Sequence, residues 1–438
     1  MPRVTSTDSP LDHVTPYDRF AWTDTQVEQW LASGAHPHEL SAYFGAGEYR
    51  ALAALARRAR AARVTDTALR VILVPGIMGS QLGLLRAAPL PHDILWLDPL
   101  DIQHGRLAAL RLPGAAPIVA MGVVLFSYLR LKLYLRAQGF AVEFHDYDWR
   151  LSVRESGRVL AERLRAARPA RVAIVAHSMG GLVSRAALSL PDTQHVERVV
   201  LMGTPNNGSF AAVQALRGSY AVVRKVARIA EKESAESLAA DIFSTFPSLY
   251  DMLPFDACAG KADLFDERSW PASGPRPRPA LLQAALAART ELASADERFA
   301  FIAGAGVETV TAIARRRDDF VYTLTRHGDG TVPLSSAELA GARCAYARVA
   351  HSELTRDPSV AAAVVDFIRR GSTRRLPHSW VSASRACTEV SDRALRHTHA
   401  QKVDWAALTP DARRLFLQNL NEPPHLRLRV PAARRRRR

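Results

Sequence analysis

The stretch Val172-Ala-Ile-Val-Ala-His-Ser-Met-Gly-Gly181 decides the fold class of this chain. Its first five residues form a short, continuous apolar run, which is typical of a strand buried on both faces of a parallel sheet. Residues 179–190 have the pattern of a helix, so Ser178 stands on a sharp turn between a strand and a helix. Small residues on either side of such a turn, here Ala176 and Gly180, let it pack closely and lift the serine hydroxyl clear of the sheet. The pattern predicts a nucleophilic serine rather than an ordinary serine that caps a helix.

Strands and helices alternate on both sides of this turn. Apolar runs typical of strands occur at 71–74, 140–144, 172–176, 196–202, 299–303, 320–324 and 344–349. Stretches typical of helices occur at 46–63, 127–138, 152–168, 179–190 and 358–370. The alternation predicts an α/β-hydrolase fold, a mostly parallel sheet flanked by helices and built from right-handed crossovers.

The same alternation divides the chain into three parts. We expect a helical appendage at 1–65, the catalytic α/β domain at 66–371 and a C-terminal extension at 372–438 with a modest helix near 410–419 and an arginine-rich, disordered tail. The alternation pauses at about 209–292, where amphipathic helices are expected. Because ligands bind beyond the carboxyl ends of the strands in such sheets, we expect this insertion to form a cap there. The alternative is that its helices simply complete the core.

A nucleophilic serine needs a histidine base and a carboxylate that holds the histidine in the right tautomer. In α/β-hydrolases these partners follow the serine in the order acid, then histidine. Asp329 lies in a glycine-flanked loop just after a predicted strand, and His351 directly follows the next one. His327 is an alternative base, but it shares a loop with Asp329 and is poorly placed to bridge to Ser178. The ordered set Ser178, Asp329 and His351 therefore predicts a catalytic triad.

Two backbone amides should stabilise the oxyanion of the reaction. In this fold one comes from the residue after the nucleophile, and the other comes from the loop after the first core strand. The first is the amide of Met179, at the start of a helix. The second loop is Val74-Pro-Gly-Ile-Met-Gly-Ser80, in which Ile77 follows the Pro-Gly pair. We therefore predict Ile77 and Met179 as the oxyanion donors.

With these residues assembled, the sequence resembles the lecithin:cholesterol acyltransferase family, which includes phospholipases and bacterial relatives. The matching segments cover roughly residues 70 to 370 and are Val74-Pro-Gly-Ile-Met-Gly-Ser80, Trp96-Leu-Asp-Pro99, Asp146-Tyr-Asp-Trp-Arg150, His177-Ser-Met-Gly-Gly181, Gly203-Thr-Pro-Asn-Asn-Gly208, Phe246-Pro-Ser-Leu-Tyr250 and Gly328-Asp-Gly-Thr-Val-Pro333. The resemblance carries over the same triad and oxyanion donors. It also implies that Trp149 lies near the acyl group, with a buried structural tryptophan as the alternative.

The resemblance implies serine-dependent acyl transfer or hydrolysis on an ester lipid, of the phospholipase or O-acyltransferase type, through an acyl-serine intermediate. It implies no metal and no organic cofactor. Animal members carry a disulfide-closed lid after the first strand, whereas no cysteine occurs in that part of this chain. One alternative is a generic carboxylesterase or neutral lipase with the same catalytic residues. Another is a non-catalytic scaffold that binds a lipid or a partner.

The composition bears on partners and location. The chain has 438 residues and a formal net charge of +15, and its 58 basic residues are nearly all arginine, spread along the sequence. No aromatic residue interleaves with the terminal run Arg434–Arg438, so we expect no nucleic-acid partner; a transient contact of this run with an anionic membrane surface is the minority alternative. The three cysteines, Cys258, Cys344 and Cys387, suggest neither a disulfide framework nor a metal site. Without a recognisable signal sequence or membrane span, a cytoplasmic protein is expected, with signal-independent export as the alternative.

Overall fold

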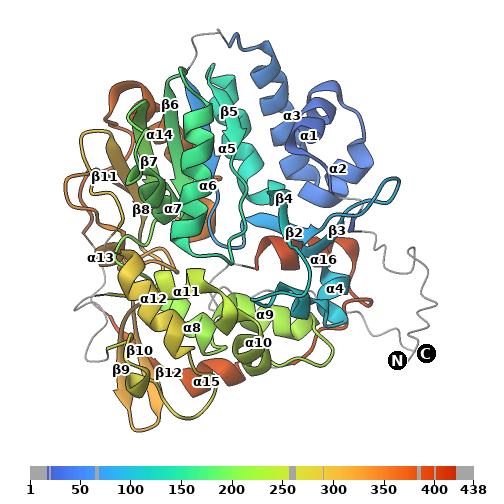
Figure 1. Cartoon of the computed structure of the whole chain (residues 1–438). Helices are drawn as coiled ribbons and strands as arrows, with labels where there is room; N and C mark the ends of the chain where they lie inside the picture. Colours follow the sequence, from blue (N-terminus) through green and yellow to red (C-terminus); the bar gives the residue numbers. More distant parts are fainter. Residues whose placement is uncertain are drawn as a thin grey trace.

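The computed structural model describes residues 17–18, 21–64, 69–255, 263–289, 291–381, 386–398 and 401–420. Its centre is a six-stranded parallel sheet with the strand order β11-β8-β7-β6-β1-β5 (Figure 1). The strands are β1 (Arg70–Val74), β5 (Ala141–Phe144), β6 (Val172–His177), β7 (Val196–Met202), β8 (Phe299–Gly304) and β11 (Arg343–Ala347). Each coincides with a predicted strand. This helix-flanked parallel sheet confirms the predicted α/β-hydrolase fold class.

Helices cover both faces of the parallel sheet, because successive side chains of a strand point to opposite faces. Ile174 of β6 belongs to one apolar core and the next residue, Val175, belongs to the other. The first core includes side chains of α6 (Val153–Ala166) and α7 (Met179–Leu188), and the second includes side chains of α5 (Leu125–Ala137) and α14 (Pro358–Arg370). Burial on both faces is the physical reason for the uninterrupted apolar run that opens the sequence pattern.

Two small antiparallel sheets flank the parallel one. The first has the order β3-β2-β4 and consists of β2 (Ser80–Leu84), β3 (Asp93–Trp96) and β4 (Val119–Val123). The second has the order β12-β10-β9 and consists of β9 (Thr309–Arg316), β10 (Asp319–Thr325) and β12 (Thr388–Ser391). The strand expected at 320–324 therefore exists, but it does not continue the parallel sheet. A two-residue turn at 317–318 joins β9 to β10, and so short a connection pairs them as an antiparallel hairpin.

The N-terminal helices pack on the outside of α5. They are α1 (Asp24–Ser33), α2 (Pro37–Phe44) and α3 (Ala46–Ala61). Ion pairs reinforce this contact: Lys132 of α5 pairs with Asp24 and with Glu28, and Arg130 pairs with Glu48. Lys132 is buried, so these carboxylates offset the cost of removing its ammonium from water. The segment expected as an appendage is thus helical and joined to the sheet domain through α5.

The insertion lies below the parallel sheet in the view of Figure 1. Its α-helices are α8 (Phe210–Leu216), α9 (Ala221–Ile229), α10 (Ala235–Asp241), α11 (Pro247–Asp251) and α12 (Pro279–Arg289). Leu216 and Val223 are fully buried and belong to the same apolar core as Ile174 of the sheet. These helices therefore complete the core, whatever else they cover.

The C-terminal extension is more ordered than the sequence suggested. It contributes strand β12, helix α15 (Asp392–His397) and helix α16 (Pro410–Gln418), of which only α16 was expected. Asp392 is fully buried, where it accepts hydrogen bonds from Arg217 at the end of α8 and from Tyr322 of β10. The expected arginine-rich tail, at 421–438, lies outside the described residues.

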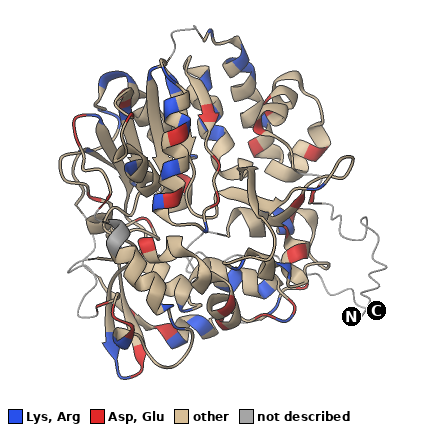
Figure 2. Cartoon of the chain, viewed as in Figure 1, with Lys and Arg blue, Asp and Glu red and all other residues tan. Residues whose placement is uncertain are grey.

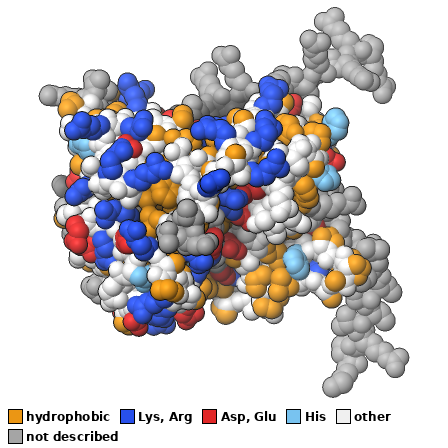
Figure 3. Space-filling view, turned by 90° about the horizontal axis from the view of Figure 1, so that it is seen from above, with side chains coloured by type: hydrophobic (Ala, Val, Ile, Leu, Met, Phe, Trp, Pro, Cys, Tyr) orange, Lys and Arg blue, Asp and Glu red, His pale blue; other side chains and the backbone are white. Residues whose placement is uncertain are grey.

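Basic residues are spread over many elements rather than gathered on one (Figure 2). On the face shown in Figure 3 they lie among apolar and acidic side chains. Many arginines pair with carboxylates, as Arg106 does with Asp93 and Asp101. Within the described ranges, we find no helix with both the length and the apolar character needed to cross a membrane.

Candidate active site

Ser178 stands on the turn between β6 and α7, in a strained backbone conformation. Its φ of 55° and ψ of −129° lie in a region that non-glycine residues rarely occupy. Neighbouring glycines make the tight turn possible. A Cβ atom on Gly180 would lie 2.4 Å from the carbonyl oxygen of Pro75, and one on Gly181 would lie 2.0 Å from Thr204 Oγ1. The requirement for a small residue after the serine therefore has a direct steric cause.

The three residues predicted as a triad lie in hydrogen-bonding contact. The Nε2 atom of His351 is 2.9 Å from Ser178 Oγ, and its Nδ1 atom is 2.7 Å from Asp329 Oδ2. All three side chains are buried. Their loops follow β6, β10 and β11, which is the order expected from the sequence. The exposed His327 lies elsewhere on the acid loop, so the ring in contact with Ser178 is that of His351.

Backbone hydrogen bonds fix the acid loop. The second carboxylate oxygen of Asp329 accepts hydrogen bonds from the amides of Thr331, at 3.0 Å, and Val332, at 2.7 Å. The backbone carbonyl of Asp329 also accepts a hydrogen bond from the amide of His351 at 2.8 Å. These bonds orient the carboxylate and leave Oδ2 free to face the imidazole.

The insertion takes part in this loop as well. Ser209 caps α8 by accepting from the amide of Ala211, and its hydroxyl donates to the carbonyl of Thr331 at 2.5 Å. Tyr220, which precedes α9, lies close to the Thr331 side chain, and burial raises the pKa of its phenol to about 12. The insertion therefore contacts the acid loop directly, so removing it should disturb the triad. The sequence offered no motif for either contact.

The loop after β1 is fixed by hydrogen bonds at four of its residues. The Tyr147 hydroxyl donates to the carbonyl of Pro75 at 2.9 Å, and the Trp96 indole donates to the carbonyl of Met78 at 3.1 Å. The amide of Val124 donates to the carbonyl of Gly79 at 2.9 Å, and the amide of Gly76 donates to the Tyr128 hydroxyl at 2.9 Å. Trp96 and Tyr147 belong to motifs that suggested the family resemblance, although no role was predicted for either residue.

This loop lies directly against the nucleophile. A Cβ atom on Gly76 would lie 2.7 Å from Ser178 Cβ. Ile77 is the next residue of the loop, and Met179 is the first residue of α7 on the other side of Ser178. A helix N-terminus favours negative charge, so an oxyanion at this position would be stabilised by the helix as well as by the amides. The placement suits the two predicted donors.

Trp149 is fully buried in a cluster of aromatic rings. Its ring centroid is 5.4 Å from that of Trp96 and 5.7 Å from that of Phe246, and its indole donates to the carbonyl of Ser80 at 3.0 Å. These contacts favour the structural alternative. A role beside the acyl group stays a prediction.

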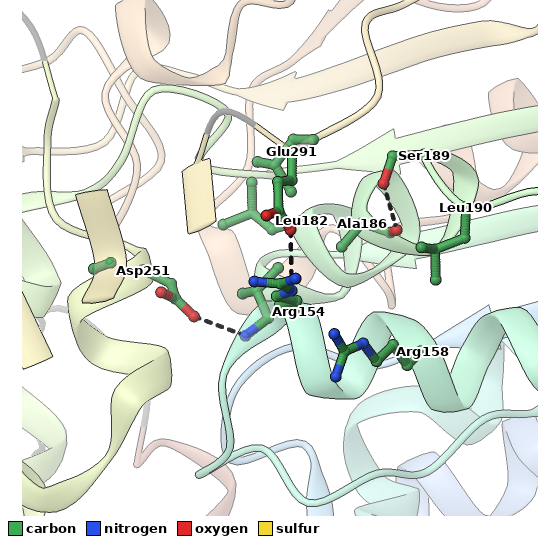
Figure 4. Close-up of a pocket in the computed structure, with 11 residues that line it drawn as sticks. Arg154, Arg158, Leu182, Ala186, Ser189, Leu190, Asp251 and Glu291 are labelled. Carbon is green, nitrogen blue, oxygen red and sulfur yellow. Dashed lines mark hydrogen bonds and ion pairs between the residues drawn. The ribbon is translucent and has the colours of Figure 1, made fainter. Parts of the chain in front are cut away.

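Two cavities are lined by residues outside the triad. A small one, of about 70 Å³, lies between α6, α7 and the insertion, where Arg154 pairs with Glu291 at 3.0 Å (Figure 4). A larger one, of about 270 Å³, lies between α2, the β2 sheet and α16 and is mainly apolar; its charged lining residues are Arg413 and Arg414. Neither lining includes a triad residue. Among the described residues, no group of three or more His, Cys, Asp or Glu side chains is placed to hold a metal ion.

Comparison with known proteins supports the fold class. A family model described as the PGAP1-like alpha/beta domain matches residues 158–251, a minor part of the chain that includes Ser178. No curated protein sequence matches the chain significantly. Together with the parallel sheet, the match supports an α/β-hydrolase. It does not confirm the resemblance to the lecithin:cholesterol acyltransferase family, which rests on the seven motifs.

Several solved structures are similar in fold. The lipase BlEst2 of Bacillus licheniformis in its propeptide form is 14% identical, with a TM-score of 0.37; the match covers 73% of this chain and 54% of that one, so this chain spans about half its length. The mature form is 14% identical with a TM-score of 0.36, and 71% of this chain and 95% of that one are covered. A chain of the Tle4–Tli4 complex is 14% identical with a TM-score of 0.43, covering 69% and 98%.

Proposed function

We propose that this chain is a serine hydrolase or O-acyltransferase that acts on ester lipids, with Ser178 as nucleophile, His351 as base and Asp329 as the orienting acid. The observation that carries the proposal is the pair of hydrogen bonds, 2.9 Å and 2.7 Å long, that joins the three side chains through one imidazole. A serine that meets a histidine and a buried carboxylate in this order has the arrangement needed for nucleophilic catalysis.

In the first half of the reaction, Ser178 Oγ bonds to the ester carbonyl carbon while its proton passes to His351 Nε2. Asp329 accepts from the Nδ1–H of the imidazolium and stabilises its positive charge. The amides of Ile77 and Met179 donate to the carbonyl oxygen as it becomes an oxyanion. The ester C–O bond then breaks, and the leaving alkoxide takes the proton from His351 Nε2.

In the second half, water or an acceptor alcohol attacks the acyl-serine. His351 takes the proton of the attacking hydroxyl, and Ser178 Oγ recovers it as the acyl bond breaks. Whether the product is a free acid or a new ester depends only on which hydroxyl reaches the acyl carbon first. Neither half requires a cofactor, because every proton moves between the ester, the attacking hydroxyl and the triad.

The proposal of a fatty-acyl substrate has support beyond the motifs. The cavity of about 270 Å³ is mainly apolar, and it includes Gln81 and Val124. Both adjoin the carboxyl end of the loop after β1, residues 74–80 (the oxyanion loop): Gln81 follows Ser80, and Val124 is hydrogen-bonded to Gly79. Apolar pockets with a few polar groups are typical of sites for small apolar ligands. We assign this cavity to the distal part of the acyl chain. A carboxylesterase for short, neutral esters would have no use for it.

The decisive experiment combines active-site labelling with product analysis. One portion of the purified chain is treated with a fluorophosphonate, and a separate, unlabelled portion is offered mixed phospholipids, triglyceride and short esters, with and without an acceptor alcohol. We expect labelling of Ser178 and release of fatty acid or transfer to the alcohol, detected by mass spectrometry. Labelling that persists in Ser178→Ala would overturn the nucleophile, and turnover of short esters alone would favour the carboxylesterase. An intact protein that neither labels nor turns over any ester would favour the non-catalytic scaffold.

The predicted division into domains, the cytoplasmic location and the absence of a nucleic-acid partner stay proposals of the same kind. A membrane-surface contact would suit a lipid substrate, and lipid vesicles of defined charge provide the test. Binding that rises with the fraction of anionic lipid and falls with added salt would support it.

A further inference from the structure

A chain of hydrogen bonds links the loop after β11 that carries His351 (the base loop) to the oxyanion loop. It runs through two side chains outside the triad. Tyr128, on α5, and His177, which precedes the nucleophile, are both buried. The Tyr128 hydroxyl oxygen is 3.1 Å from His177 Nδ1, and His177 Nε2 is 3.1 Å from the backbone carbonyl oxygen of His351. At the other end the amide of Gly76 donates to the same tyrosine oxygen at 2.9 Å.

The direction of every bond in this chain follows from its ends. The carbonyl oxygen of His351 can only accept, so His177 must carry its proton on Nε2. Burial, together with the nearby His351, lowers the pKa of His177 to about 3, so its imidazole is neutral and Nδ1 bears a lone pair. The Tyr128 O–H must then donate to Nδ1. Its oxygen keeps lone pairs, one of which accepts from the amide of Gly76.

We propose that Tyr128 and His177 are positioning residues that hold the oxyanion loop and the base loop in register. The proposal rests on the proposed function. Gly76 immediately precedes Ile77, so the tyrosine hydroxyl holds the peptide group next to the one that carries the Ile77 amide. His177, through the carbonyl of His351, fixes the residue that supplies the base.

Close packing around this chain supports a positioning role. A Cβ atom on Gly79 would lie 2.8 Å from the Tyr128 hydroxyl, so the loop can approach the tyrosine only because a glycine is present. Thr355, four residues after His351, donates to the carbonyl of Ser127 at 2.7 Å and so ties the base loop to α5 beside Tyr128. The centroids of the His177 and His351 rings are 4.7 Å apart. A second charge that close would oppose formation of the His351 imidazolium, and the neutral His177 avoids this.

The test is Tyr128→Phe, which removes the hydroxyl and keeps the ring. The amide of Gly76 then loses its acceptor, and the oxyanion loop loses one of its four ties. Misplacement of a catalytic group by about 1 Å can cost about a hundredfold in rate. We therefore expect kcat on a short ester to fall by about tenfold to a hundredfold with KM nearly unchanged. His177→Leu should lose about as much, and the double variant little more, because both changes break one chain.

A matched control separates positioning from ordinary stability. Tyr250 is also buried, and its hydroxyl likewise accepts from a backbone amide, that of Arg278 at 2.8 Å, and donates to a partner, the carbonyl of Ser244 at 2.8 Å. Tyr250→Phe should lower the melting temperature about as much as Tyr128→Phe while leaving kcat on the short ester within about twofold. Equal losses of kcat in the two variants would overturn the proposal.

Two further outcomes keep the test decisive. If Ser178→Ala abolishes activity but Tyr128→Phe retains kcat within about twofold, the proposed function survives and the positioning role is wrong.

Nitrogen-15 spectra of the histidines in the unaltered protein test the predicted tautomer of His177 independently of kinetics. We expect one imidazole protonated only on Nε2 from pH 5 to 9, assigned to His177 by its disappearance in His177→Leu. An Nδ1–H tautomer for that residue would contradict the direction of the chain.

Discussion

Two buried polar clusters in this protein are built on different physical terms. Around Ser178, hydrogen bonds, many of them to backbone groups, hold the loops, and the carboxylate of Asp329 bonds to His351 and to two backbone amides. At the junction of the insertion with the C-terminal extension, Arg217 and Asp392 are both fully buried and form an ion pair at 3.0 Å. The first cluster joins the three residues proposed for catalysis, and the second joins segments that are far apart in the chain.

The junction is almost completely satisfied. Arg217 donates to Asp392 and also to the carbonyls of Ser273 and Pro275, each at 2.6 Å. Tyr322 donates to the other oxygen of Asp392 at 2.9 Å. A buried ion pair contributes little net stability, because desolvation offsets the attraction between the charges, but losing one partner is costly. A change in the active-site cluster should therefore alter the reaction rate, whereas a change at the junction should alter the stability of the fold.

The largest effect is expected from Asp329→Asn, by analogy with other triads about ten-thousandfold in kcat/KM. A neutral amide cannot stabilise the imidazolium, and its NH₂ group favours the wrong tautomer of His351. The melting temperature should change little, since the amide has almost the same shape as the carboxylate. Kinetics on a short ester and calorimetry measure the two. His327→Ala, on the same loop, is the control and should lose less than about fivefold; a larger loss there would put the base assignment in doubt.

The opposite separation is expected at the junction. Asp392→Asn leaves Arg217 buried without a charged partner and should lower the free energy of unfolding by about 3–5 kcal/mol, measured by urea denaturation. Well below the unfolding transition, activity on a short ester should stay within a few-fold of normal. The control is Glu389→Gln on β12, the strand that directly precedes Asp392. Its ion pair with Arg316 is about half exposed and should contribute less than about 1 kcal/mol. Similar losses of unfolding free energy in both variants would show that the buried pair at the junction matters no more to stability than an exposed one.

The cavity assigned to the acyl chain allows a comparison within one helix. Leu417 of α16 lines it, whereas Leu415 is exposed. Each buried methylene is worth about 0.8 kcal/mol, so kcat/KM should rise with chain length over several carbons. Leu417→Asp should lower kcat/KM on long esters by about thirtyfold, which corresponds to roughly 2 kcal/mol of lost binding free energy in the transition state. It should leave kcat/KM on short esters unchanged. Leu415→Asp should spare both, and equal behaviour of the two variants would remove the acyl chain from this cavity.

The same contrast explains what the sequence could predict. Local patterns of apolar residues and glycines predicted all six strands of the parallel sheet, because each depends on near neighbours in the chain. They also singled out Ser178, Asp329 and His351, whose side chains lie in hydrogen-bonding contact. The contacts of Tyr128 with Gly76, and of Arg217 with Asp392, join residues far apart in sequence and carry no motif. The β10 strand was expected from its apolar pattern, but its sheet was not, because pairing depends on the hairpin turn before it. The sequence left open whether the helices of the insertion form a cap or complete the core, since amphipathic helices look alike in both settings. Leu216 and Val223 are buried in the core.

The smallest effect is expected in the pH dependence of the free energy of unfolding, through His145. His145, just after β5, is buried with its ring 6.0 Å from that of Tyr147, which holds the oxyanion loop. Burial, reinforced by the charge of Arg163, lowers the pKa of His145 to about 4, whereas an unfolded histidine has a pKa of about 6.5. Between these values the unfolded chain binds a proton that the folded protein does not. Stability therefore falls as the pH falls through that window, by up to about 1.4 kcal/mol per pH unit for this one group.

His145→Gln removes the imidazole that binds this proton in the unfolded chain. The free energy of unfolding should therefore depend less steeply on pH between about 6 and 4.5. His177 titrates lower and is present in both proteins, so it does not alter the difference. Urea denaturation at several pH values measures the two slopes. Parallel curves for the variant and the unaltered protein would mean that His145 does not stay neutral in the folded state. A shallower curve for the variant would instead locate part of the acid sensitivity at His145, beside the oxyanion loop.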